Sequence, residues 1–262
     1  TPLPWLRQGK ILLQQQRWAE AEVAFAEAGR RQGGLEALLG RGESQAGRGD
    51  WAAAARTWLR ALTLAPEEPR VFLALGRAAI TQGRFDEAQQ RLERAISLHP
   101  WPETAREAHA LLGRLLLTDD PETAVAHLEQ AGDLDLLAVL EAAQAQTSPG
   151  SQALLAGVAL LQRREPSLAR HYLEHAAVVA PTDARARAYL AYTLDQLGET
   201  AAARDLLEQA LQIDAGEAMA HYFLGLHERN MGRLEKAQEA FGQALRLDPE
   251  NAAFHVEMAE TF

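Results

Sequence analysis

The sequence predicts an all-α fold in which antiparallel helix pairs stack side by side as a solenoid. Prolines recur at a spacing of 34 residues, as Pro66 and Pro100 do, and small and bulky apolar residues repeat in phase along nearly the whole chain. No convincing stretch alternates apolar and polar residues as a strand would. Stacked repeats bury their core between neighbours, so the length of 262 residues does not set a number of domains.

The second helix of each predicted pair has one apolar stripe. An alanine near its start is followed four residues later by a bulky residue and seven residues later, in every copy, by a second alanine. This spacing places all three on one helix face, so we expect seven helix pairs. The alanines that begin the stripes are Ala21, Ala54, Ala88, Ala124, Ala169, Ala203 and Ala237.

The first helix of each pair has a small residue at one fixed position. Glycine inside a helix costs about 1 kcal/mol relative to alanine, so its recurrence predicts close helix packing. These residues are Gly9, Gly42, Gly76, Gly113, Gly157, Ala191 and Gly225. Four further glycines fit left-handed ends of first helices: Gly49, Gly83, Gly198 and Gly232. Asp50 and Asp86 fit as caps of second helices or as complements of their dipoles.

The stretch from Ala218 to Asn251 resembles a tetratricopeptide repeat. The small, aromatic and proline positions of that roughly 34-residue pattern are occupied by Leu224-Gly225, Ala237, Phe241, Ala244 and Pro249. The resemblance covers nearly the whole chain in about seven repeats. It implies a right-handed α-solenoid, a superhelix whose first helices line a concave surface. Arg41 and Gln45 depart from it, because they occupy first-helix positions that are normally apolar.

Residues 133–146 interrupt the phase of the repeats and predict one extra helix, followed by a loop over residues 147–150. We interpret this helix as a decayed repeat that covers core, or as a helix that sets the angle between two halves or partly fills the groove. The expected organisation is four repeats over 2–132, the extra helix and loop over 133–149, three repeats over 150–251, and a capping or truncated helix over 252–262.

Composition argues against several classes of protein. The net charge of −10 disfavours a general nucleic-acid or anionic-membrane binder. The absence of cysteine excludes disulfides, thiolate metal sites and cysteine nucleophiles. The sequence contains no apolar run that would predict membrane insertion and no signal peptide that would predict targeting. These absences slightly favour the cytoplasm and leave the compartment open. The chain begins without Met and stops inside a helical pattern, so we expect a segment of a longer protein.

No group of residues predicts catalysis, a cofactor or a metal site, and we expect a protein that is not an enzyme. His171 and His175 have a zinc-compatible spacing, but they lie off the apolar stripe, so a solvated face is the favoured interpretation. His109, His221 and His255 share one first-helix position and are predicted to be packing residues.

The concave surface implied by the resemblance is apolar and aromatic in repeats five to seven. Tyrosine supplies a large contact area and a polar tip, so we predict that a peptide binds there. The alternative is that several of these side chains pack between adjacent helices. The predicted contacts are Leu154, Leu155, Val158, Tyr189, Tyr192, Met219, Tyr222, Phe223, Leu226, Arg229 and Asn230, with Leu161, Asp195 and Gln196 on the same faces.

In repeats one to four the corresponding position is mostly basic, with Lys10, Arg77 and Arg114 beside one acid, Glu43. These cations predict contacts with an acidic segment, and a scatter of solvated arginines is the alternative. The pattern by which some relatives hold chaperone carboxyl termini is not reproduced, since Gly40 and Glu43 stand where amides are needed. The asparagine ladder of O-GlcNAc transferase repeats is also missing.

We therefore predict a non-catalytic protein–protein interaction scaffold that holds a peptide or helix in its concave groove. The identity of the partner and the oligomeric state are left open. One alternative is the targeting or regulatory region of a larger enzyme, for example a glycosyltransferase, whose catalytic domain lies outside this chain. Another is a scaffold that assembles through apolar ends at Trp5 and Phe262.

Overall fold

The computed structural model describes residues 1–99, 101–146 and 148–260, and these residues form sixteen α-helices and no strand. The prediction of an all-α solenoid is confirmed. The chain divides into two compact units, residues 1–134 (unit 1) and residues 135–262 (unit 2), and each is described by itself. Three residues of the sequence-based predictions, Pro100, Thr147 and Phe262, lie outside the described residues.

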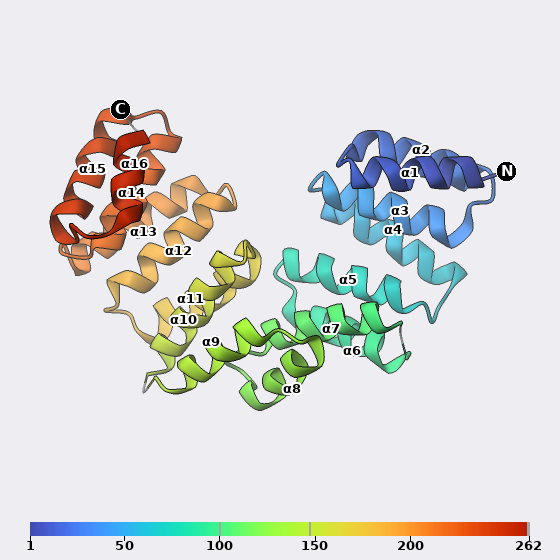
Figure 1. Ribbon diagram of the computed structural model, residues 1–262, viewed down its shortest axis with the longest axis horizontal. Coiled ribbons are helices and arrows are strands. Elements are labelled where there is room, and N and C mark those ends of the chain that lie inside the picture. Colours follow the sequence, from blue (N-terminus) through green and yellow to red (C-terminus); the bar gives the residue numbers. More distant parts are fainter. Residues whose placement is uncertain (100, 147, 261–262) are drawn as a thin grey trace. The chain divides into compact units, whose positions relative to one another are not determined.

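Unit 1 consists of four antiparallel helix pairs (Figure 1). Each first helix packs on its own second helix, and each second helix packs on the first helix of the next pair. The helices are α1 (Leu3–Gln14), α2 (Trp18–Arg30), α3 (Gly34–Gly47), α4 (Trp51–Leu64), α5 (Pro69–Thr81), α6 (Phe85–Ser97), α7 (Pro102–Leu115) and α8 (Pro121–Ala131).

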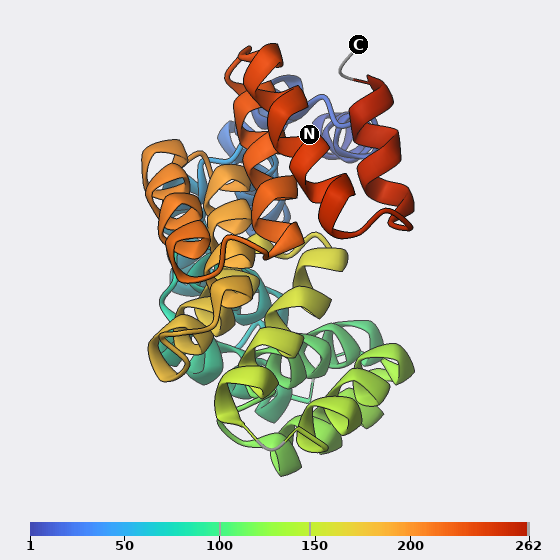
Figure 2. The same cartoon turned by 90° about the vertical axis from the view of Figure 1, so that its left-hand side faces the viewer.

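Unit 2 repeats the arrangement with three pairs, which Figure 2 shows from another side. Its helices are α10 (Pro149–Gln162), α11 (Pro166–Val179), α12 (Ala184–Gln196), α13 (Thr200–Ile213), α14 (Ala218–Asn230), α15 (Leu234–Leu247) and α16 (Ala252–Glu260). The extra helix is α9 (Leu134–Gln144), which buries Leu136, Leu140 and Ala143. Its effect on the angle between halves stays a prediction.

The glycines inside the first helices lie where the paired second helix comes closest. A Cβ atom built at Gly42 would lie 2.2 Å from Trp58 Nε1, and one at Gly225 would lie 2.4 Å from Phe241 Cε1. Real Cβ atoms do not approach other atoms so closely, so only glycine fits without a shift of the ring. The predicted close packing is confirmed at these positions.

Most of the predicted helix ends are also confirmed. Gly49 and Gly232 adopt left-handed φ values of 83° and 74° after α3 and α14. Gly83 and Gly198 adopt left-handed φ values of 70° and 84° after α5 and α12. The Asp50 carboxylate accepts a hydrogen bond from the Ala53 backbone N–H at 2.9 Å and caps α4. Asp86 is not a cap but lies in the first turn of α6, where its charge complements the dipole.

The loop predicted over residues 147–150 is wrong in its second half, because α10 begins at Pro149. Proline suits the first turn of a helix, where its missing N–H would have no partner. Gly150 belongs to the same turn and packs closely against the C-terminal end of α11, since a Cβ atom there would lie 2.7 Å from Cβ of Ala180, the residue that follows this helix.

The two polar departures from the repeat pattern belong to a hydrogen-bonded joint between α2, α3 and α4. Gln45 is buried, and its amide donates to Glu22 at 2.8 Å and accepts from the Thr57 hydroxyl at 2.7 Å. Arg41 also donates to Glu22, at 3.4 Å. A buried polar group is tolerated when it is paired, so these residues replace apolar packing with a hydrogen-bond network.

Unit 2 has a joint of the same kind at the equivalent position of α14. The Glu228 carboxylate is buried and accepts from Arg204 of α13 at 2.5 Å and from Arg233 at 3.0 Å. Next to it, His227 Nδ1 lies 2.9 Å from the Asp195 carboxylate of α12. Adjacent repeats in this unit are therefore held together by polar contacts as well as apolar ones.

Candidate functional site

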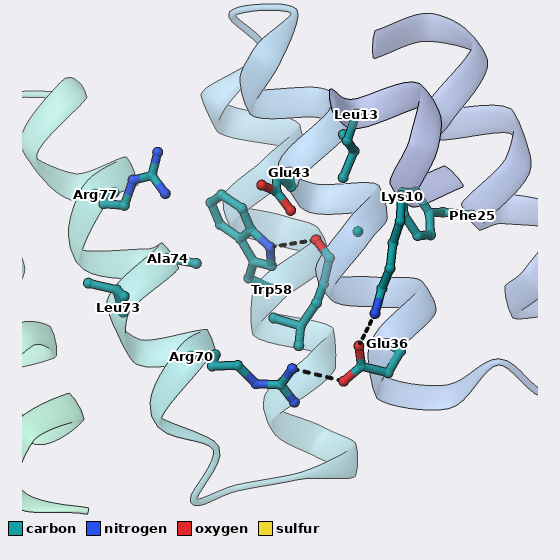
Figure 3. A pocket seen from close by; sticks show the side chains of 12 residues that line it. Lys10, Leu13, Phe25, Glu36, Glu43, Trp58, Arg70, Leu73, Ala74 and Arg77 are labelled. Carbon is teal, nitrogen blue, oxygen red and sulfur yellow. Dashed lines mark hydrogen bonds and ion pairs between the residues drawn. The ribbon is translucent and has the colours of Figure 1, made fainter. Parts of the chain in front are cut away.

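A cavity lined mainly by first helices lies in unit 1, and we call it the inner hollow (Figure 3). It has a volume of about 270 Å³ and opens between α1, α3 and α5. Its lining residues are Lys10, Leu13, Phe25, Glu36, Leu39, Gly40, Glu43, Trp58, Arg70, Leu73, Ala74 and Arg77.

Apolar side chains form the floor of the inner hollow. Phe25 and Trp58 reach it from the second helices and are only 1% and 4% exposed. The Trp58 indole N–H donates to the Leu39 backbone oxygen at 3.3 Å, which fixes the orientation of the ring. Leu73 and Ala74 of α5 complete the floor. The ring positions are set by packing, so the floor is formed before any ligand arrives.

Charged residues of both signs form the rim. At one end, Glu36 accepts from Arg70 at 2.9 Å and lies 3.7 Å from Lys10 Nζ. At the other end lie Arg77 and Glu43, with Ala74 between the two ends (Figure 3). Arg77 pairs with Glu107 at 3.5 Å. Glu43 is exposed and has no ion pair within the described part of the chain.

Arg70 also links the inner hollow to Trp101, the residue that precedes α7. Its guanidinium donates to Glu68 at 2.8 Å, and this hydrogen bond holds the pKa of the Glu68 carboxyl below its ordinary value. The same guanidinium lies 4.9 Å from the centre of the Trp101 ring, which is 65% exposed. An exposed aromatic ring therefore lies beside this end of the rim.

The three cations predicted to contact an acidic segment do not form one row. Lys10 and Arg77 both line the inner hollow, whereas Arg114 pairs with Asp133 at 3.2 Å and is mostly buried. All three have carboxylate partners. The positive charge available to a ligand at these positions is thus smaller than the sequence indicates.

The aromatic residues predicted to contact a peptide in unit 2 pack on one another. The Phe223 ring stacks on Tyr192 with centroids 4.6 Å apart and meets the edge of Tyr189 at 5.0 Å. Phe223 is only 4% exposed, so it does not offer a ligand the direct contact that was predicted. Instead, its ring packs against both tyrosine rings and supports them. Tyr189 and Tyr192 are half-buried and keep part of their surface free.

Helix α16 covers the other end of this aromatic cluster. Phe254 lies 4.8 Å from the Tyr222 ring, and burial raises the pKa of Tyr222 to about 12. Arg229 pairs with Glu257 of the same helix. The other predicted contacts are half-buried, namely Leu154, Leu155, Val158, Leu161, Asp195, Met219 and Leu226, whereas Gln196 and Asn230 are exposed.

Sequence reasoning missed the apolar floor of the inner hollow. Leu39 and Leu73 stand four residues before Glu43 and Arg77, which places each leucine on the same helix face as the rim residue. That spacing is readable from the sequence. What is not readable is that Trp58, from a second helix, reaches the same cavity.

Histidines of the first helices do more than pack. His221 Nε2 lies 3.0 Å from the Ala215 backbone oxygen, and His255 Nε2 lies 2.8 Å from that of Pro249. Both rings therefore bind the loop that precedes their own helix. No group of three or more potential metal ligands is found among the described residues.

His109 of α7 and His127 of α8 form a pair whose Nδ1 atoms are 2.7 Å apart. Such a contact requires one neutral nitrogen to accept from the other ring. Burial lowers the pKa of both rings, and His109 lowers the pKa of His127 further, whereas the charges of Glu93 and Asp120 oppose the shift.

We expect this pair to destabilise unit 1 in mild acid. The rings take up protons near pH 6.5 in the unfolded chain, but only at lower pH in the folded chain. The pair therefore contributes its full stabilisation above pH 6.5 and loses it as the pH falls below that value. The loss should be about 1 kcal/mol, that of one hydrogen bond. Urea unfolding at pH 7.5 and 5.0 checks this: replacing both histidines with glutamine should reduce the difference, and an unchanged difference would contradict the assignment.

None of the helices that the structure describes is long and apolar enough to cross a membrane.

Comparisons with known proteins agree with the repeat architecture. Family models described as tetratricopeptide repeat match residues 6–69 and 154–218, residues 45–115, and residues 218–251. The chain belongs to the tetratricopeptide repeat family. No curated protein matches the sequence.

Several solved structures are similar at low sequence identity. The Cut9 and Hcn1 hetero-tetramer of the APC/C has a chain with 15% identity and a TM-score of 0.46, and the match covers 98% of this chain and 48% of that one. A tetratricopeptide repeat protein from Parabacteroides merdae has 14% identity and a TM-score of 0.45, with 99% and 98% covered. The P58(IPK) repeat domain has 18% identity and a TM-score of 0.41, with 99% and 64% covered.

Proposed function

We propose that the protein is an interaction scaffold that holds an extended segment of a partner protein in the inner hollow of unit 1. Tetratricopeptide repeats support the general role, because stacked helix pairs provide a preformed surface with little ordering cost to the scaffold. The observation that carries the proposal is the apolar floor of the inner hollow, fixed by Trp58 and enclosed by a charged rim.

The shape and chemistry of this cavity fit one large apolar side chain. Binding sites in proteins combine an apolar pocket, which supplies affinity, with a few polar groups that fix orientation. A volume of about 270 Å³ lies just below the range of pockets that bind small molecules, so the cavity suits a single side chain. A partner segment would therefore place an aliphatic or aromatic anchor between Leu39, Leu73 and Ala74.

The rim favours a segment with charges of both signs beside this anchor. Lys10, Arg70 and Arg77 face Glu36 and Glu43 around the opening, and the cations are already ion-paired. Glu43, which has no such partner within the described residues, would accept a basic side chain of the ligand. This revises the expectation of a strongly acidic ligand at these positions.

In unit 2, the half-buried Tyr189, Tyr192 and Met219 stay proposed contacts. Their rings and thioether are supported by the buried Phe223, so a ligand would meet a firm surface. Tyr222 and Arg229 are engaged by α16 and contribute less.

Photo-crosslinking tests the proposal at single positions. A benzoylphenylalanine in place of Lys10 replaces a rim side chain that is 64% exposed, whereas one in place of Leu59 lies on the exposed side of α4. In cells that express the native protein, we expect the first variant to crosslink a discrete partner and the second to give none. Equal crosslinking from both positions, or none from position 10, would exclude the inner hollow.

A further inference from the structure

A second hollow lies between α2, α3 and α4 of unit 1, and we call it the outer hollow. Its volume is about 490 Å³. It shares only Phe25 with the inner hollow, among the described residues that line the two. The lining residues are Phe25, Ala26, Gly29, Arg30, Gly34, Ala37, Leu38, Arg41, Arg60 and Leu64.

The charge of the outer hollow is opposite to that of the whole chain. Arg30, Arg41 and Arg60 line it, and none of its described lining residues is acidic. The chain has a net charge of −10, so a cavity with three guanidinium groups is a local exception. Each group comes from a different helix, which arranges them around the opening.

Neighbouring carboxylates do not neutralise this charge. Glu27 is shared by Arg30 at 2.5 Å and Arg31 at 3.5 Å. Glu22 is shared by Arg41 at 3.4 Å and Arg48 at 3.0 Å. Two carboxylates therefore serve four guanidinium groups, and each guanidinium keeps N–H donors to spare.

Arg60 has no carboxylate partner in the part of the chain that the structure describes, and its side chain is exposed. A guanidinium presents two parallel N–H donors that match a carboxylate. Arg60 is thus the group in the outer hollow that is freest to bind an anionic ligand.

Apolar and small residues give the outer hollow a place for an aliphatic side chain. Leu64 is 60% exposed, and Leu38 is half-buried on α3 beside it. Gly29 and Gly34 leave the entrance open, since a Cβ atom at Gly34 would meet nothing within 4 Å.

We propose that the outer hollow binds an acidic segment of a partner protein, with its carboxylates on Arg30, Arg41 and Arg60 and an aliphatic side chain against Leu38 and Leu64. This site is independent of the inner hollow and goes beyond the function proposed above. It also moves the predicted acidic-segment contacts from Lys10, Arg77 and Arg114 to a cavity where Arg60 has no carboxylate partner among the described residues.

The test uses a fluorescent synthetic peptide of glutamate and leucine, titrated into the full chain and followed by fluorescence anisotropy. Arg60→Glu should weaken binding by about tenfold or more, because it replaces an attractive charge with a repulsive one. The matched control is Arg56→Glu, one turn earlier on α4, exposed and outside the lining. Arg60→Lys keeps the charge and should lose less.

The outcomes separate this proposal from the others. Saturable binding by the wild type that Arg60→Glu removes, and that Arg56→Glu and the inner-hollow variant Glu43→Trp leave unchanged, supports the outer hollow. Equal losses in Arg56→Glu and Arg60→Glu would show general attraction to a basic surface and overturn it. A loss in Glu43→Trp alone would place the peptide in the inner hollow, and absence of saturable binding would also overturn the proposal.

Discussion

Replacing Gly42 with alanine is expected to destabilise unit 1 by about 2 kcal/mol. The new Cβ atom would lie 2.2 Å from Trp58 Nε1 and 2.5 Å from Trp58 Cε2, so the indole must move. Trp58 is 4% exposed and its N–H is bonded to the Leu39 backbone, so movement disturbs packing and a hydrogen bond together. The helix propensity of alanine, about 1 kcal/mol better than glycine, offsets only part of this loss.

The matched control is Gly76→Ala, at the same repeat position of α5. There the new Cβ atom would meet Leu92 Cδ2 at 2.7 Å, the end of a side chain that can change rotamer. Urea unfolding followed by circular dichroism should show a clear fall in midpoint for Gly42→Ala and a smaller one for Gly76→Ala. Equal midpoints for Gly42→Ala and the wild type would contradict close packing at this joint.

Because Trp58 also forms the floor of the inner hollow, the same substitution links stability to the candidate site. A shifted indole changes the shape of the cavity even when the unit stays folded. The glycine predicted from the repeat pattern as a packing residue thus also positions a residue of the site.

The helix pairs were predictable because each repeats the same short-range spacing. Gly225 and Phe241, for example, follow one pattern that seven copies share, and the structure places them in contact. The phase break at α9 was readable for the same reason. The start of α10 was not, because Pro149 suits both a loop and a first helical turn.

The candidate site was only partly predictable, because its properties depend on contacts between repeats. Lys10 and Arg77 were assigned to an inner surface and both line the inner hollow. Their charge is reduced by Glu36 and Glu107, which come from other helices and cannot be paired with them from spacing alone. Phe223 was predicted to contact a ligand in the groove, but it is buried against Tyr189 and Tyr192 of α12. This contact joins two repeats, so the spacing within one repeat does not reveal it.

Replacing Ala74 with tryptophan is expected to reduce partner binding at least about tenfold, because the new side chain fills the inner hollow. Ala74 lies between the two charged ends of the rim and is half-buried, so a larger side chain there extends into the cavity (Figure 3). Glu43→Trp is a second filling variant at an exposed position, and it guards against a folding defect at position 74. Leu59→Trp, on an exposed part of α4 outside the inner hollow, is the matched control.

The measurement that tests the central claim most directly is the quantitative recovery of partners by four baits, the wild type and the three tryptophan variants. Their unfolding midpoints are first shown to be equal. Proteins enriched by the wild type and by Leu59→Trp should be depleted about tenfold with both Ala74→Trp and Glu43→Trp. Equal recovery by all four baits would contradict the account, because it would mean that no partner segment enters the inner hollow.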